Sequence, residues 1–231
     1  MSVAAAVREF CERGDRALGL LGAVLPDMSL PIAAWLDDAD EVRLLAPSSG
    51  RSALDASLVI AVCRCSERVF PLLLEAGADP AAFGSEALVQ AACYGEGWDL
   101  FGDALLRRGA EPRPEALWEA LQFWNTDAVI DLLESGVPCG EQELAMAASY
   151  GDVASVRRLL HHGAPATAWV LARAMTVVSD HNSWALDPEE DDYADIVRLL
   201  LEAGGEPCEE AVAVARLHGR ADIVALLEGK K

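Results

Sequence analysis

The chain has 231 residues, of which 52% are hydrophobic, and a formal net charge of −20 from 38 acidic and 18 basic residues. This apolar content and a mean hydropathy of +0.19 exclude disorder for most of the chain. The longest apolar run, Ala17 to Leu25, spans nine residues, which is too short to cross a bilayer. The negative charge repels nucleic acid and anionic membranes and attracts basic partners; alternatively, it only keeps an apolar chain soluble.

The first 50 residues are predicted to form a helical cap. Residues 3–13 and 15–25 have helical patterns, Pro26 and Pro31 mark a turn, and residues 33–45 form a less regular segment before a loop at 46–50. Arg8, Glu9 and Glu12 stand where an export signal would need apolar residues, so we expect a cytoplasmic protein. Because this segment lacks the repeat described next, its expected role is to cover one end of a repeat array.

A short phrase recurs through the rest of the chain: two leucines, two further residues, a glycine, and in most copies a proline soon after. The glycines are Gly77, Gly109, Gly136, Gly163 and Gly204, spaced by 32, 27, 27 and 41 residues, and Leu226-Leu227 begins a truncated last copy. Glycine just beyond the last helical turn adopts a left-handed conformation at no steric cost, and proline prevents the helix from continuing. Each phrase is therefore predicted to end a helix.

Two helices are predicted between successive phrases. In the clearest unit, residues 141–150 form an alanine-rich helix, Gly151 makes a tight turn, and Asp152 caps the next helix. The second helix has an apolar stripe that ends at Leu159 and Leu160.

The stretch from Ala147 to Ala164 resembles the second half of an ankyrin repeat, and residues 91–95, 195–200 and 222–227 match parts of it. The resemblance covers residues 51–231 and implies an all-α solenoid of about six helix-pair repeats with an N-terminal helical cap. The family's Thr-Pro-Leu-His opening is missing, since Glu143 to Met146 stands in its place. Spacings of 27 against about 33 residues predict shortened β-hairpin fingers. A generic α-hairpin solenoid is the alternative.

No catalytic or cofactor motif is found in the sequence, so we expect no enzyme, no cofactor and no metal. Cys63 and Cys65 lack a second ligand pair at zinc spacing, and the six cysteines are interpreted as small buried residues. His161 and His162 diverge on a helix. The cluster of Ser179, Asp180, His181 and Ser183 is interpreted as a polar loop rather than a catalytic triad.

The 41-residue spacing indicates an acidic insertion near residues 179–192, between the two helices of its unit. Asp187, Glu189 and Asp191 alternate as in a calcium loop, but the glycine and terminal glutamate of that motif are missing. A solvated loop, a metal site and a partner-contacting loop all remain open. For the third, the anchors are Trp184 and Tyr193, among Glu189, Glu190, Asp191 and Asp192.

A second candidate surface follows from aligning the units on their glycines. The position two residues beyond the alanine pair is occupied by Arg64, Tyr94, Phe123, Tyr150, Val177 and His218. In proteins that resemble ankyrin this position borders the concave face, where aromatic residues bury a partner's side chains. The alternative is packing between repeats, which we favour for Phe123; we favour a surface role for Tyr94 and Tyr150. The predicted protein-binding residues are Tyr94, Phe123, Tyr150, His218, Trp184, Glu189, Glu190, Asp191, Asp192 and Tyr193.

The predicted function is a non-catalytic module that is monomeric when unbound and binds a basic protein, but neither nucleic acid nor membrane. Arginine supplies sixteen of the eighteen basic residues and alanine is abundant, which points to a GC-rich bacterial genome. An immunity protein that neutralises a toxin, such as a nuclease with a basic cleft, is the sharper alternative. A nucleic-acid mimic and an enzyme built on a helical-repeat scaffold are further alternatives.

Overall fold

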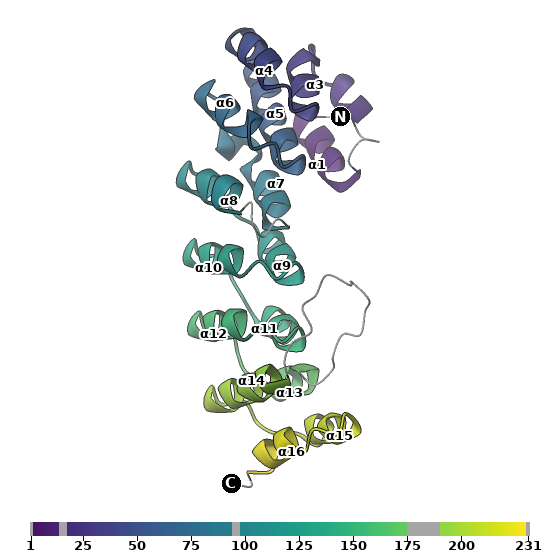
Figure 1. Ribbon diagram of the computed structural model, residues 1–231, viewed down its shortest axis with the longest axis vertical. Helices are drawn as coiled ribbons and strands as arrows, with labels where there is room; N and C mark the ends of the chain where they lie inside the picture. Colours follow the sequence, from purple (N-terminus) through teal and green to yellow (C-terminus); the bar gives the residue numbers. More distant parts are fainter. Residues whose placement is uncertain (1, 14–17, 94–97, 175–189, 230–231) are drawn as a thin grey trace. The chain divides into compact units, whose positions relative to one another are not determined.

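The computed structural model describes the chain except for residues 1, 14–17, 94–97, 175–189 and 230–231. The chain divides into two compact units, Met1–Glu119 and Ala120–Lys231, each described by itself below. Every regular element in the described residues is helical (Figure 1). Most helices come in pairs, in which we call the first the inner helix and the second the outer helix.

Unit 1 contains three helix pairs and two preceding helices. These preceding helices are α1 (Val3–Arg13) and α2 (Leu18–Gly22). The pairs are α3 (Ser29–Trp35) with α4 (Ala39–Leu45), α5 (Arg51–Cys63) with α6 (Val69–Glu75), and α7 (Pro80–Ala92) with α8 (Trp98–Arg107). A short 3-10 helix, Ala46–Ser48, follows α4. Inner helices α3, α5 and α7 pack side by side, and outer helix α4 packs on α6.

Unit 2 continues the same arrangement. Helix α9 (Pro114–Gln122) spans the division and pairs in sequence with α10 (Thr126–Glu134). It is followed by α11 (Glu141–Ser149) with α12 (Val153–His161), α13 (Ala168–Ala174) with α14 (Glu190–Glu202), and α15 (Glu209–Leu217) with α16 (Ala221–Leu227). Inner helices α11, α13 and α15 pack in series, as do outer helices α10, α12, α14 and α16. The described residues from 51 onward thus form six pairs, which confirms the predicted all-α repeat fold.

The recurring leucine–glycine phrase ends the outer helices as predicted. The first leucine of each copy is fully buried: Leu73, Leu105, Leu132, Leu159 and Leu200. Its carbonyl oxygen accepts a hydrogen bond of 2.9–3.1 Å from the residue after the glycine. The five glycines have φ between 87° and 94°, which other residues adopt only with strain. Of the prolines in the phrase, Pro80 opens a helix, whereas the proline that opens α9 is Pro114.

The inner helices share a second pattern, Leu-x-x-Ala, which α15 has as Val212-x-x-Ala215. The alanines are all at most 3% exposed: Ala33, Ala61, Ala91, Ala120, Ala147, Ala174 and Ala215. Their small side chains let the outer helix approach closely. In five pairs the alanine carbonyl also accepts a hydrogen bond of 2.8–3.1 Å from the backbone N–H five residues further on. This donor is the N-cap of the outer helix in four pairs, and Ser66, which precedes the N-cap Arg68, in the fifth. The residue before this donor is left-handed, with φ of 52–76° at Asp37, Cys65, Trp124, Gly151 and Gly219.

Helices α3 and α4 have this same repeat geometry, although they lie inside the predicted cap. Leu30 and Ala33 supply the Leu-x-x-Ala pattern, and Asp37 is the left-handed residue of the turn. Asp38 Oδ1 accepts from Glu41 N at 3.0 Å, as Asp152 Oδ1 accepts from Ser155 N at 3.0 Å. The segment expected to be less regular is thus a regular pair. This pair lacks the leucine–glycine phrase, because Leu44 and Leu45 are followed by Ala46 and Pro47 and not by a glycine.

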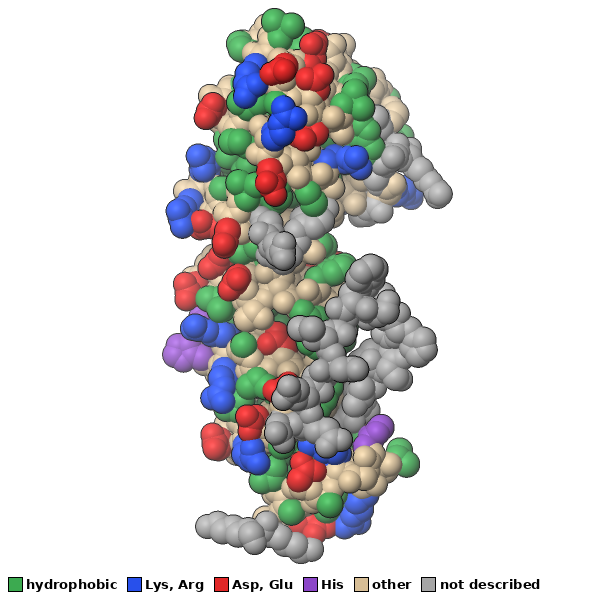
Figure 2. Space-filling model, viewed as in Figure 1, with side chains coloured by type: hydrophobic (Ala, Val, Ile, Leu, Met, Phe, Trp, Pro, Cys, Tyr) green, Lys and Arg blue, Asp and Glu red, His purple; other side chains and the backbone are tan. Residues whose placement is uncertain are grey.

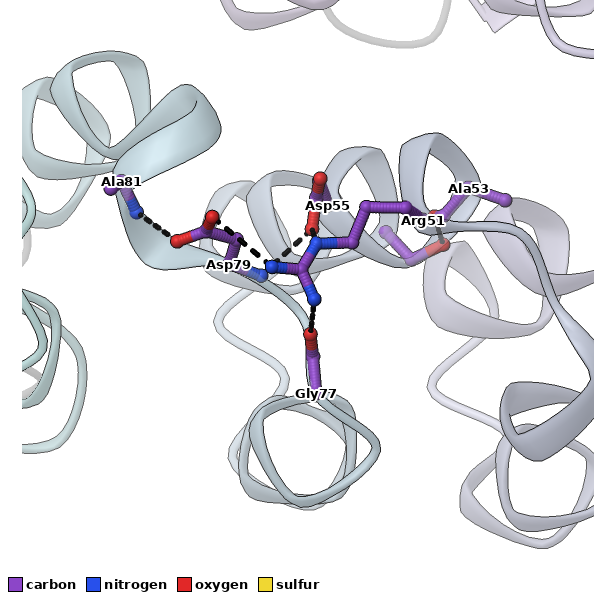
Figure 3. A network of polar contacts seen from close by, with 7 residues as sticks. Arg51, Ala53, Asp55, Gly77, Asp79 and Ala81 are labelled. Carbon is purple, nitrogen blue, oxygen red and sulfur yellow. Dashed lines mark hydrogen bonds and ion pairs between the residues drawn. The ribbon is translucent and has the colours of Figure 1, made fainter.

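The connections between pairs are short and contain no strand in the described residues, which confirms the shortened fingers. Hydrogen bonds tie these connections to the inner helices, and Figure 3 shows the network before α7. Arg51 donates from Nη1 to Gly77 O at 2.7 Å and from Nη2 to Asp79 Oδ2 at 3.2 Å. Asp79 N donates to the buried Asp55 at 2.7 Å, while Asp79 Oδ1 caps α7 by accepting from Ala81 N at 3.0 Å. Side chains of α5 thus hold the connection between α6 and α7 in place without a β-hairpin.

Candidate functional site

In unit 1 the inner helices are covered by helix α1. Figure 1 shows α1 on the side of α5 and α7 that faces away from α6 and α8. Phe10 packs edge-on against Trp35 of α3, with ring centroids 5.6 Å apart. Arg8 Nη2 lies 3.2 Å from Glu86 Oε1 of α7, and Cys11 Sγ lies 3.8 Å from Cys63 Sγ of α5. One helix therefore contacts all three inner helices of the unit.

The buried position of α5 follows from this cover. Residues 53–62 of α5 are all buried, because α3 and α7 flank the helix, α6 packs on one side and α1 on another. A helix that is apolar all round is typical of such burial. Within residues 53–62 only Asp55 and Ser57 are polar. The end of α5 is also engaged, since the Arg64 guanidinium lies 4.3 Å from the centroid of the Trp35 ring.

In unit 2 the inner helices and the residues that follow them expose large apolar side chains. The exposed fraction is 47% at Phe123, 46% at Trp169 and 82% at Leu217. The core leucines and alanines of the same helices are fully or almost fully buried. The core positions of these helices are thus already occupied, and the large exposed side chains lie outside the core. They form the candidate site of the chain, which we call the unit 2 inner face.

Three predicted residues lie at matching places at the ends of the inner helices. Phe123, Tyr150 and His218 each follow an inner helix and precede a left-handed residue. Phe123 is exposed rather than packed between repeats, and His218 is exposed as well. Tyr150 is half-buried against Trp124, with ring centroids 6.0 Å apart and planes tilted by 38°. The structure thus shows an aromatic edge formed by Phe123, Trp124 and Tyr150.

Trp169 was missed in the sequence analysis. It lies in the first turn of α13, where Thr167 Oγ1 contacts Glu141 Oε2 of α11 at 3.2 Å and Cys208 Sγ contacts Ala168 O at 3.5 Å. The starts of α11 and α15 therefore flank it, and both carry exposed acidic residues. These are Glu141, Glu209 and Glu210. Alignment on Leu-x-x-Ala would have found Trp169, because it occupies the place of Gln142 and Glu210, which are exposed polar residues.

Tyr193 is an internal residue, so its prediction as a partner anchor needs correction. It is 7% exposed, and its hydroxyl donates to Ser149 O at 3.3 Å. Burial raises its pKa, with Asp192 adding to the effect and Arg220 opposing it. The ring and hydroxyl are both used inside unit 2, which leaves little of the side chain for a partner. Glu190 and Asp191 begin α14, and Asp192 is half-buried.

Several other predicted residues lie outside the described part of the chain. They are Tyr94, Trp184 and Glu189, together with Val177, Asp187 and the polar cluster at residues 179–183. The partner-contacting, metal-binding and solvated interpretations of the acidic insertion therefore all remain predictions.

The described residues offer no metal site. No group of three or more His, Cys, Asp or Glu side chains among them could hold a metal ion. His161 and His162 are exposed at the end of α12, with their rings edge to face at 5.5 Å. Figure 2 shows acidic and basic side chains interspersed over the outer helices of each unit. Within the described residues, every helix falls short of the length and apolar character that a membrane span requires.

Paired helices joined by left-handed turns, with short strandless connections, define a helical-repeat protein. Its solved structural neighbours give the kind of repeat. The human ASB11 ankyrin repeat domain is similar to the chain with a TM-score of 0.60 and 19% identity, over 87% of this chain and 97% of that one. The ankyrin repeat protein EF0377 aligns at 18% identity over 88% of this chain and 98% of that one, with a TM-score of 0.37. The similarity to the ASB11 domain shows that the chain has the ankyrin-repeat fold, as its sequence indicated. No protein-family model matches it, and no curated protein sequence is similar to it.

Proposed function

We propose that the chain is a non-catalytic protein-binding module that takes a basic partner on the unit 2 inner face. The observation that carries the proposal is the exposure of Phe123, Trp169 and Leu217, which lie on or directly after inner helices whose core leucines and alanines are buried. Aromatic residues with polar surroundings are the usual anchors of protein interfaces, because they bury much area at low entropic cost.

The charge around this face supports a basic partner. Glu209 and Glu210 are exposed in the first turn of α15, and Glu141 is exposed in the first turn of α11. An arginine or lysine of a partner could stack on the face of Trp169 while pairing with these carboxylates. The chain's net charge of −20 would speed the encounter with such a partner.

The first experiment is affinity capture from the native host with the wild-type chain as bait, followed by binding kinetics on variants. Trp169→Ala and Phe123→Ala are expected to speed dissociation by about 30-fold, the equivalent of roughly 2 kcal/mol for a buried anchor. Glu209→Gln with Glu210→Gln is expected mainly to slow association and to weaken its salt dependence, because charges at the rim steer encounter.

Matched controls lie on the outer helices. Glu134→Gln and His161→Ala change exposed residues at the ends of α10 and α12 and should leave the kinetics unchanged. Unchanged kinetics for the Trp169 and Phe123 variants, with their circular dichroism intact, would remove the unit 2 inner face as the binding site.

The partner's identity also tests the immunity alternative. A captured toxin whose activity is blocked by the wild-type chain, but not by the Trp169 variant, would make the chain an immunity protein. A captured partner without toxic activity would instead support a general adaptor role.

A further inference from the structure

Two thiols meet where α1 lies on the inner helices of unit 1. Cys11 comes from α1 and Cys63 from the end of α5, and their sulfur atoms are 3.8 Å apart although 52 positions separate them in sequence. Both residues are half-buried, and all six cysteines of the chain are thiols in the structure. The exposed Cys65 lies two residues beyond Cys63.

The other half-buried cysteines make different contacts. Cys93 donates to Val89 O at 3.5 Å, Cys139 to Leu159 O at 3.9 Å, and Cys208 to Ala168 O at 3.5 Å. The expectation of six small buried residues is wrong in part, because Cys65 is exposed and the other five are half-buried. Cys93 Sγ also lies 3.7 Å from Glu119 Oε2. Cys11 and Cys63 are different, because each thiol has the other as a neighbour across two separate helices.

We propose that Cys11 and Cys63 are a modification site, at which a reversible disulfide fastens α1 over the inner helices of unit 1. A disulfide has an S–S bond of about 2.05 Å, so the two sulfur atoms must approach by about 1.8 Å. Rotation of the two side chains about χ1 shifts their sulfur atoms on this length scale. The oxidant is a low-molecular-weight disulfide, such as oxidised glutathione.

The reaction is thiol–disulfide exchange in two steps. The Cys11 thiolate attacks one sulfur of the small disulfide, forms a mixed disulfide and releases one thiolate. Cys63 then loses its proton and attacks Cys11 Sγ, which forms the Cys11–Cys63 bond and releases the second thiolate. The protein loses two electrons and two protons, and the small disulfide gains them as two thiols.

The bond would change how firmly α1 is held. With the thiols reduced, α1 is held by the packing of Ala6, Val7 and Phe10 and by the ion pair of Arg8, whose side chain is 57% exposed. With the disulfide formed, α1 is covalently closed onto α5 and cannot leave this face. The inner helices of unit 1 would then stay covered, whatever binds elsewhere.

The environment of Cys63 sets the pH dependence of the reaction. The hydrogen bond with Cys11 and burial hold the pKa of the Cys63 thiol well above its usual value. Since the thiolate is the reactive form, bridging is expected to be slow at neutral pH and faster as the pH rises.

The test uses the whole chain, incubated with oxidised glutathione at pH 7.0 and pH 8.5 under native conditions. Thiol titration after denaturation should show a loss of two of the six thiols, faster at pH 8.5, and dithiothreitol should restore them. Mass spectrometry of proteolytic fragments should show a Cys11–Cys63 link. The Tm of unit 1 should rise by roughly 5–10 °C, because the bond closes a long loop of the unfolded chain.

The controls separate this pair from the other thiols. Cys11→Ser should abolish the link and the rise in Tm, whereas Cys65→Ser and Cys139→Ser should leave both unchanged. A thiol count that stays at six, or links through Cys65 or between chains, would overturn the proposal. Mapping the link in the wild-type chain decides this even if a variant does not fold.

Discussion

The two units are built from the same helix pairs but treat their inner helices differently. In unit 1, helix α1 covers the middle of this face: Ile60 of α5 is 1% exposed, whereas Ile32 at the same place of α3 is 42% exposed. In unit 2 the corresponding residues are Met146, which is half-buried, and Arg173, which is exposed. The same kind of repeat can therefore serve as core or as surface, depending on whether another segment covers its inner helix. The sequence adapts to the cover at these face positions, while the Leu-x-x-Ala pattern stays the same.

The largest expected difference between the units comes from a matched pair of phenylalanines. Phe10→Ala removes a buried ring from the contact between α1 and α3 and should cost about 3–5 kcal/mol of unit 1 stability. Phe123→Ala changes an exposed ring in unit 2 and should cost below about 1 kcal/mol. Urea unfolding with hydrogen exchange resolved by peptide measures both. Equal losses would mean that α1 is not a core element of unit 1.

The second prediction concerns the outer helices, which should behave alike in both units. Leu73→Ala in unit 1 and Leu159→Ala in unit 2 each truncate a fully buried leucine and should cost about 2–5 kcal/mol. Leu160→Ala should cost roughly half as much, because Leu160 is half-buried. The same unfolding measurements apply. If Leu160→Ala lowered the free energy of unfolding more than Leu159→Ala, the side of α12 that carries Leu160 would be the buried one, contrary to the structure.

The third prediction tests whether α3 and α4 form a pair of the same kind as the later ones. Asp38→Ala and Asp152→Ala each remove an N-cap hydrogen bond of 3.0 Å and should each cost about 1 kcal/mol. Asp40→Ala is the control, because its pair with Arg43 is exposed and should contribute below about 0.5 kcal/mol. If Asp38→Ala cost as little stability as Asp40→Ala, and not as much as Asp152→Ala, the turn before α4 would not be equivalent to the turn before α12.

The smallest effect is expected from the network of Figure 3 in unit 1. Burial is the main cause that raises the pKa of Asp55 above its ordinary value of 3.8, against the opposing hydrogen bond from Asp79 and the charge of Arg51. Folded chains therefore hold this proton at pH values at which unfolded chains have lost it. The contribution of Asp55 to the free energy of unfolding consequently falls as the pH rises from 3.8 through the folded pKa, and is constant above it.

Asp55→Asn removes this titration but keeps an oxygen that can accept from Asp79 N. The stability of the wild type relative to this variant should thus decline between pH 4 and pH 7 in urea unfolding. A relative stability that rises over this range would show that the hydrogen bond and Arg51 outweigh burial.

Much of the fold could be predicted from local residues. A glycine in the left-handed conformation, a buried leucine one turn before it and a capping aspartate are fixed within about ten residues of chain. In α12, Asp152 caps the N-terminus, Leu159 is buried in the core and Gly163 closes the C-terminus, all as expected. The short spacing of the phrases likewise predicted connections without strands, since too few residues remain between helices to form a hairpin.

The tertiary structure decided which faces are covered. The local pattern at residues 3–13 predicted a helix but not its place across α3, α5 and α7, which depends on contacts between residues far apart in sequence. The same holds for Phe123, expected to pack and found exposed, and for Tyr193, expected at the surface and found buried. Helical periodicity shows which residues share a side of a helix, whereas the neighbours that bury that side come from the whole chain. The pairing of Cys11 with Cys63 likewise became visible only in the folded chain.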